Sequence, residues 1–184
     1  LVTSMQFSIM VACTNQGGIG KNGTIPWHLP PDWRYFQRIT TASPPGKTNA
    51  IIMGRKTWES LPKKPLADRL NVVISSTVTC NDVPIDRNLR VFSSLEVALE
   101  ELKGMPIHKI FVIGGEKLYQ VALEHPYCTH VYVTRVMTPE KIECDTHFPL
   151  QQFERSGKYT KVATSPLQKY NRIEFVFEDY EKSA

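Results

Sequence analysis

The chain has 184 residues, of which 41% are hydrophobic and 22% are charged, and its formal net charge is +4. This composition is too apolar for a disordered chain, and the length suits one domain, which we expect to cover residues 1–184. No apolar run approaches the roughly 18 to 20 residues that cross a bilayer, and no signal segment opens the chain, so we expect an intracellular, cytoplasmic protein without a membrane partner. Residues 1–4 do not extend the first expected strand, and they are either a remnant of expression or the end of a longer N-terminus.

The cysteines and the charges exclude two further kinds of site. Cys13, Cys80, Cys128 and Cys144 show no CxxC spacing and no histidine cluster accompanies them, so we expect reduced thiols, with Cys13 buried in a strand, and no metal site. The positive charge is spread along the chain, whereas a nucleic-acid surface gathers its basic residues on one face. We therefore expect no nucleic-acid partner, and a mild charge that suits small anionic ligands.

Nearly continuous apolar runs alternate with helical patterns along most of the chain. In chain order, the expected elements are a strand over 7–14, a helix over 32–39, a strand over 49–53, a helix over 55–61, a strand over 71–75, a helix over 94–102 with a serine cap, a strand over 109–114, a helix over 116–123 and a strand over 130–136. This alternation predicts an α/β fold with right-handed crossovers and a mainly parallel sheet covered on both faces. The last segments, "KYTKVAT" and "NRIEFVFEDYE", alternate apolar and polar residues and predict an antiparallel hairpin at one edge.

Two of the predicted strand-to-helix corners carry glycine. Gly54 precedes Arg55 and Lys56, and Gly114 and Gly115 separate another strand from its helix. Either corner alone is more often a plain turn, and neither is a GxGxxG fingerprint. Together they favour a phosphorylated, nucleotide-like ligand, because helix N-termini at the carboxyl ends of strands offer free amides to anions. The two cations indicate an extra phosphate, as on the ribose of NADP.

Asp32 is a lone carboxylate in an aromatic segment, "PWHLPPDWRYF". It could simply begin a helix, with Trp33 and Phe36 in the core. Asp32 and Phe36 are four residues apart, however, so the carboxylate lies on the aromatic face, from which Arg34 and Arg38 point away. A ligand with adjacent N–H donors, such as an aminopyrimidine or a pterin, would satisfy both carboxylate oxygens.

The segment from Asn15 to Trp27 reads as a long glycine-rich loop after the first strand. Loops of this length in a compact domain are often lids or binding loops. Trp27 follows Pro26 and is either ordinary packing or a cap over the site.

With these residues in place, the chain resembles dihydrofolate reductase over essentially its whole length. The resemblance is carried by "GIGKNG", "PW" followed by the acid and "YF", "MGRKTWES", "PLADRLNVV", "VIGG" with Tyr119, "VTR" and "CDTHFP". It implies a three-layer sandwich with a mainly parallel eight-stranded sheet, an antiparallel C-terminal edge strand and about four flanking helices. It also implies NADPH-dependent reduction of 7,8-dihydrofolate to tetrahydrofolate for one-carbon metabolism and thymidylate synthesis, binding of antifolates in the same pocket, and a monomer or part of a fusion with thymidylate synthase.

The resemblance also implies the site residues. The catalytic set is Ile25, Trp27, Asp32 and Thr134. The substrate set is Met10, Val11, Ala12, Asp32, Trp33, Phe36, Leu61, Arg69, Ile113, Tyr119 and Thr134. The cofactor set is Ala12, Ile19, Gly20, Gly54, Arg55, Lys56, Thr57, Ser75, Ser76, Gly114, Gly115, Glu116, Lys117, Leu118 and Tyr119.

In this scheme Asp32 holds the pterin's amino group and ring nitrogen, and biases protonation of the pterin while water delivers the proton. Arg69 pairs with the α-carboxylate of the folate's glutamate, although it could instead be a surface arginine before a strand. The Gly114–Gly115 bond would be cis. A reductase acting on another heterocycle would share the cofactor corners but would need neither the acid followed by "YF" nor Arg69. A noncatalytic binding module would require a degraded acid or cofactor corner.

Some residues depart from the family pattern. Vertebrate-like members usually have phenylalanine where Trp33 stands, glutamate at the acid, and an extra residue between the tryptophan and the acid. They also tend to have an arginine at the position of Ser76. Without that cation, some of the recognition of the extra phosphate falls on Arg55 alone, and the preference for NADPH over NADH would be weaker than usual.

Overall fold

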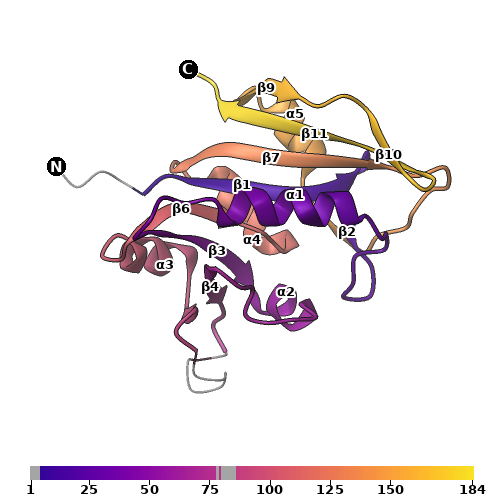
Figure 1. The fold of residues 1–184 in the computed structure, drawn as a ribbon. Coiled ribbons are helices and arrows are strands. Elements are labelled where there is room, and N and C mark those ends of the chain that lie inside the picture. The colour runs from indigo at the N-terminus through magenta and orange to yellow at the C-terminus, as the bar shows by residue number, and fades with distance from the viewer. Residues whose placement is uncertain (1–4, 78, 80–85) are drawn as a thin grey trace.

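The computed structural model describes residues 5–77, 79 and 86–184, so the expectations for residues 1–4 and Cys80 lie outside the described residues. Its main sheet holds six parallel strands within the described ranges (Figure 1). Their spatial order is β7 (Cys128–Met137), β1 (Phe7–Thr14), β6 (Ile107–Val112), β3 (Thr48–Gly54), β4 (Arg69–Ile74) and β5 (Leu89–Phe92). The predicted strands are confirmed to within two residues at each end, and β5 is an additional strand that the apolar pattern did not predict.

The antiparallel part of the sheet lies beside β7. β11 (Ile173–Lys182) pairs with β7 in the antiparallel sense, which confirms the antiparallel C-terminal strand. β9 (Tyr159–Thr164) and β10 (Gln168–Tyr170) pair with different ends of β11 and together form the edge. The described main sheet therefore has eight strand positions, as predicted, and β11 lies one position inside the edge because β9 and β10 cover it.

Five helices occur in the described part of the chain, one more than the approximate number predicted. They are α1 (Pro30–Thr41), α2 (Arg55–Ser60), α3 (Leu95–Leu102), α4 (Glu116–Glu124) and α5 (Leu150–Arg155). α5 was missed because six residues are too few to show helical periodicity. Leu150 and Phe153 nevertheless bury its inner side against the core.

The helices form two layers, one on each face of the sheet. Side chains of α1 and α2 pack with Ile51, Met53 and Val73 on one face. Side chains of α3, α4 and α5 pack with Ile9 and Cys13 on the other, and Figure 1 shows α1 in front of the sheet with α4 and α5 behind it. This confirms the three-layer α/β architecture and the burial of the Cys13 thiol, which is free like those of the other described cysteines.

The glycine-rich segment after β1 is more ordered than a plain loop. β2 (Gly18–Gly20) pairs with β8 (Thr146–His147) in a small antiparallel sheet, so the prediction of a loop throughout Asn15 to Trp27 was wrong. The glycines allow this close approach, since a Cβ on Gly20 would lie 2.7 Å from Thr146 Oγ1. Three residues without alternating large side chains gave no strand signal.

Candidate active site

Asp32 lies in the first turn of α1, where the chain crosses the carboxyl ends of β1 and β7. The helix begins with prolines and its N-cap, Leu29, supplies no side-chain hydrogen bond. The Thr134 hydroxyl, from β7, donates a 2.7 Å hydrogen bond to Asp32 Oδ1. Thr134 pairs with Ala12 of β1 in the sheet, so the carboxylate is fixed above these two central strands. The structure therefore brings together three residues of the predicted site.

The environment of Asp32 disfavours its charge. Burial raises the pKa of the carboxyl above its ordinary value, and the hydrogen bond from Thr134 opposes part of that rise. Among the described residues no cation lies within ion-pair distance of Asp32, as its place on the helix predicted. One hydroxyl leaves most of the acceptor capacity of a carboxylate unused. A ligand with several N–H donors could therefore form additional hydrogen bonds to this carboxylate.

α1 is attached to β11, the neighbour of β7, by an aromatic contact close to Asp32. The Tyr35 ring stacks on Phe177 of β11, with centroids 4.0 Å apart and planes at 20°. Its hydroxyl also lies 3.4 Å from Asp179 Oδ1 and donates to it. Tyr35 lies less than one turn after Asp32, so these contacts limit movement of the helix start.

Tyr119 connects α4 to the strand beneath the site. Its hydroxyl donates a 2.8 Å hydrogen bond to the Met10 carbonyl oxygen, and burial raises the pKa of the phenol. The Val11 side chain packs on the opposite face of the sheet, among the core residues under α3 and α4. Only the backbone of Val11 can therefore face Asp32. Ile113, just after β6, donates its amide to the Ile52 carbonyl and is partly buried.

Several apolar side chains that the resemblance assigns to the site are incompletely covered. Trp33 is 41% exposed and stacks on Phe36 with centroids 5.2 Å apart, and Ile25 is 61% exposed. Trp27 packs near Leu29, in the small cluster under β10 and β11. Leu61 and Phe36 both pack against the cluster under α1 and α2. Exposed apolar surface beside an unpaired carboxylate is typical of a site for a flat ring with polar edges.

The two glycine corners meet directly. The Gly54 amide donates a 2.8 Å hydrogen bond to the Gly114 carbonyl, and the Gly114–Gly115 peptide is cis, which confirms that prediction. Gly54 and Gly115 are the N-caps of α2 and α4, and neither provides a capping side chain, whereas Ser94 caps α3 away from the site. The amides of both helix starts are thus open to an anionic ligand.

The two corner glycines are required for different reasons. At Gly114 φ is +121°, and a Cβ would lie 3.2 Å from the Tyr119 ring, so the protein itself requires glycine. At Gly54 φ is −76°, and a Cβ would meet only Gly114 O and Gly115 N, each at 3.9 Å. Neither the backbone nor the protein neighbours require glycine at Gly54. The space beside it is what a cofactor approaching the backbone would occupy, so the corner fits the predicted dinucleotide.

The cations at this corner lie in the first turn of α2. Arg55 Nη1 forms a 2.9 Å ion pair with Glu59 Oε1, both side chains being partly exposed, and Lys56 is exposed. The Thr57 hydroxyl lies toward the second corner, 3.5 Å from where a Cβ on Gly115 would stand. At the end of β4 the Ser75 amide donates to the Phe92 carbonyl, and Ser76 is exposed. Gly54 pairs with Ile74 in the sheet, so α2 begins beside the end of β4.

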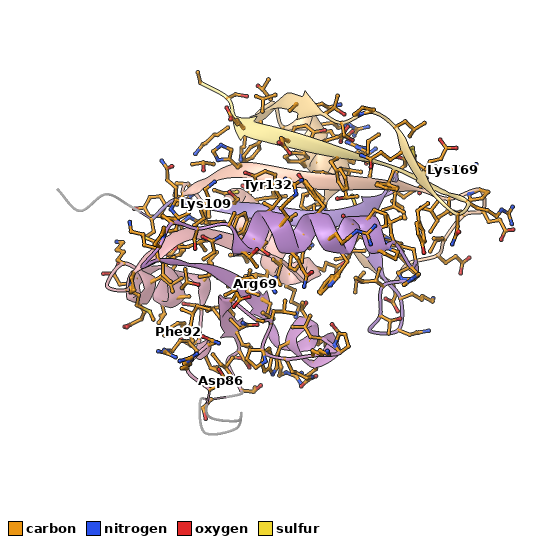
Figure 2. All side chains as sticks on the ribbon, viewed as in Figure 1. Arg69, Asp86, Phe92, Lys109, Tyr132 and Lys169 are labelled. Carbon is orange, nitrogen blue, oxygen red and sulfur yellow. The ribbon has the colours of Figure 1, made fainter. Side chains whose placement is uncertain are left out.

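Arg69 is buried beneath α1, where β4 begins (Figure 2). The residue is only 2% exposed, so the alternative of a surface arginine was wrong. Its Nε donates to the Ala67 carbonyl at 2.8 Å, its Nη1 donates to Thr40 Oγ1 at 3.0 Å, and its guanidinium carbon lies 5.7 Å from the centre of the Phe36 ring. Within the described ranges no carboxylate forms an ion pair with it. Burial lowers the pKa of Arg69, and the charge of Asp68 opposes this effect.

Known proteins support the arrangement. The family model described as dihydrofolate reductase matches residues 6–182. The chain belongs to the dihydrofolate reductase family. The dihydrofolate reductase of Schistosoma mansoni is 34% identical over 84% of this chain and 83% of that protein, and that of Drosophila melanogaster is 38% identical over 79% and 80%.

Plant relatives are larger. The bifunctional dihydrofolate reductase-thymidylate synthase of Daucus carota is 41% identical to this chain. The similarity covers 95% of this chain and 33% of that protein. The chain therefore spans about a third of the length of this relative. No helix within the described residues is long and apolar enough to cross a membrane.

The remaining positions predicted to contact the cofactor lie in different environments. The Leu118 side chain is buried in the core, and Lys117 is exposed. Glu116 Oε1 accepts a 2.8 Å hydrogen bond from the His147 amide, which ties the start of α4 to β8. Gly20 and Ile19 lie in β2, where Gly20 is explained by its contact with β8.

Sequence reasoning missed two residues that support the candidate site. Asp145 Oδ2 accepts a 2.9 Å hydrogen bond from the Asn22 amide, across 123 residues, and so holds the segment after β2. Thr40 accepts the hydrogen bond from Arg69 across 29 residues. No local pattern could reveal either partner, because both contacts are made only when distant segments come together.

Proposed function

We propose that this chain catalyses NADPH-dependent reduction of 7,8-dihydrofolate to 5,6,7,8-tetrahydrofolate. The observation that carries the proposal is one face of α1. Asp32, Phe36 and Thr40 follow one another at four-residue intervals, so they share this face, with the acid at one end and Arg69 hydrogen-bonded to Thr40 at the other. The ends are separated by roughly 12 Å along the helix axis. A substrate with an N–H-rich ring at one end and a carboxylate at the other matches this spacing.

Asp32 would anchor the pterin ring. Its oxygens can accept hydrogen bonds from the amino group and the neighbouring ring nitrogen, and such bonds favour the charged carboxylate that burial disfavours. Thr134 holds one oxygen and thereby fixes the plane of the acid. A carboxylate bound to the pyrimidine side of the pterin is badly placed to reach the reducing edge. Asp32 would act through its field and hydrogen bonds, with a water molecule delivering the proton.

The glycine corners would hold NADPH. The uncapped starts of α2 and α4 offer amides to phosphates, and the space beside Gly54 admits the cofactor close to the backbone. Arg55, reinforced by Lys56, would recognise the additional phosphate. When bound, the cofactor supplies the hydride that reduces the pterin. The chain contributes the relative position of the two ligands, since the Gly54–Gly114 hydrogen bond joins both corners.

The segment containing Ile25 and Trp27 would exclude water from the reacting rings. Ile25 is exposed, and the segment is tied back by the hydrogen bond from Asn22 to Asp145. Closure over bound ligands would bury Ile25 and the exposed edge of Trp33. The cytoplasmic location, the monomeric state, the binding of antifolates and the link to thymidylate synthesis stay predictions.

Loss of reduced-nicotinamide absorbance in the presence of dihydrofolate tests the proposal. The wild-type protein is expected to oxidise NADPH, and to oxidise NADH more slowly. Asp32→Asn should retain NADPH affinity, measured by quenching of protein fluorescence, and lose most turnover. No oxidation by the wild type, or unchanged turnover in the variant, would contradict the proposed reaction or the role of Asp32 respectively.

A further inference from the structure

Arg69, at the end of the α1 face that carries Asp32, is held by a second residue, Thr40. Thr40 is completely buried. Its hydroxyl donates a 2.7 Å hydrogen bond to the Phe36 carbonyl oxygen, one turn earlier in α1, and accepts the 3.0 Å hydrogen bond from Arg69 Nη1. Because the hydroxyl proton is committed to Phe36, the oxygen lone pairs face the guanidinium.

Thr40 is itself fixed from the opposite side. The fully buried Asn49 donates from Nδ2 to the Thr40 carbonyl at 2.8 Å and to the Ala42 carbonyl at 3.0 Å. Its Oδ1 accepts a 3.0 Å hydrogen bond from the Lys109 amide in β6. The end of α1 is thus tied to β3 and β6 by one amide side chain. The position of the Thr40 hydroxyl is consequently set by the sheet as well as by the helix.

Two hydrogen bonds from different nitrogens define the orientation of the Arg69 guanidinium. The Nε bond to Ala67 and the Nη1 bond to Thr40 fix the plane and rotation of the fork. A guanidinium has five N–H donors, so donors remain on Nη1 and Nη2 for a bidentate contact. Without the bond to Thr40, the group could rotate about its last bonds and would lose this preorganisation.

We propose that Thr40 is a positioning residue that orients Arg69 toward the carboxylate end of the substrate. The proposal rests on the proposed function, in which Arg69 receives that carboxylate. Thr40 does not touch the substrate and acts through the guanidinium. The alternative is a purely structural role, in which its hydroxyl only satisfies the end of α1.

The test compares two substrates that share the pterin. Thr40→Val removes the hydroxyl at nearly constant volume, and Thr40→Ser keeps it. KM and kcat are measured with 7,8-dihydrofolate and with 7,8-dihydropteroate, which lacks the glutamate. Thr40→Val is expected to raise KM for dihydrofolate roughly tenfold, since a hydrogen bond to a charged group is lost, and to leave kcat and the dihydropteroate reaction nearly unchanged. Thr40→Ser should restore the wild-type KM.

Arg69→Leu is measured beside these variants so that the two proposals can fail separately. If Arg69→Leu raises KM only for dihydrofolate and Thr40→Val does not, the role of Thr40 is overturned and the proposed substrate stands. If Thr40→Val weakens both substrates equally, its role is structural. If Arg69→Leu does not distinguish the substrates, the assignment of the carboxylate to Arg69 fails, and the role of Thr40 with it. Urea unfolding checks that each variant is folded. If Thr40→Val is not folded, Thr40→Ala takes its place, with the same expected rise in KM for dihydrofolate.

Discussion

The Thr134 hydroxyl and the Asp32 carboxylate, 102 residues apart in the chain, meet at 2.7 Å. The bond joins the start of α1 to the centre of the sheet, and it is the one side-chain hydrogen bond to Asp32 within the described residues. A hydroxyl stabilises the carboxylate without neutralising it, whereas an arginine or lysine would have blocked the acid. With Thr134 as its partner, Asp32 can still bind a strongly polar ligand.

Replacing Thr134 with valine should weaken substrate binding. The variant loses a hydrogen bond to a charged group, worth about 1.5–3 kcal/mol, so KM for dihydrofolate should rise roughly tenfold or more. The pKa of Asp32 should rise further, because burial would be left unopposed. Steady-state kinetics between pH 6 and 8, with Thr134→Ser as the control that keeps the hydroxyl, checks both expectations. A valine variant with wild-type kinetics would show that the bond does not support the site.

Asp32→Asn should make the ligand-free protein more stable at neutral pH. The raised pKa of Asp32 means that the folded state binds a proton more tightly than the unfolded state. The penalty for burying the charged form is absent below the pKa of Asp32 in the unfolded state, about 3.9. It grows as the pH rises from there through the higher pKa of Asp32 in the folded state. Urea unfolding should therefore show a gain for Asp32→Asn at about pH 7 that shrinks toward about pH 4.

The matched control is Glu101→Gln, which removes an exposed acid on α3. Its effect on the free energy of unfolding should be small at either pH. A gain for Asp32→Asn that is equal at both pH values would show that charge burial is not its cause.

The parts of the candidate site that depend on local pattern could be singled out from the sequence. Asp32 is recognisable because a carboxylate on an aromatic helix face needs only the 3.6-residue period, and the corners at Gly54 and Gly114 are recognisable because glycine follows a buried strand. Thr40 carried no such signal. It is one of two adjacent threonines at a helix end, and its contact with Arg69 exists only once β4 lies beneath α1.

Short elements escaped prediction for a related reason. β2, β8 and α5 have two to six residues each, and tertiary contacts stabilise them more than their own sequence does. The pairing of Gly18 with His147 depends on a partner more than a hundred positions away. Burial of Arg69 was likewise invisible, because a lone arginine before a strand is usually a surface residue.

The two corner glycines should respond differently to alanine. Gly114→Ala should lower the free energy of unfolding by about 1–3 kcal/mol, since φ is +121° and the Cβ would press on the Tyr119 ring. Gly54→Ala fits the protein and should keep or slightly raise stability, by up to about 1 kcal/mol. Its methyl group would nevertheless stand in the proposed cofactor space. NADPH affinity should fall at least tenfold while urea unfolding stays close to wild type.

Each glycine variant is the control for the other, because the two residues share a hydrogen bond. An unstable Gly54→Ala would mean that the protein itself requires this glycine. Unchanged NADPH affinity in a stable Gly54→Ala would show that the cofactor does not approach the backbone there.

Neutralising Glu59 should strengthen the preference for NADPH. Arg55 pairs with Glu59 at 2.9 Å, and the exposed position of both groups makes this pair worth only about 0.3–0.5 kcal/mol. A phosphate at Arg55 must compete with this carboxylate, so Glu59→Gln should raise the ratio of kcat/KM for NADPH to that for NADH roughly twofold. The same change in an Arg55→Ala background should have no effect, and added salt should shrink the difference. An equal gain for NADH, or a gain that persists without Arg55, would show that Glu59 does not compete with the phosphate.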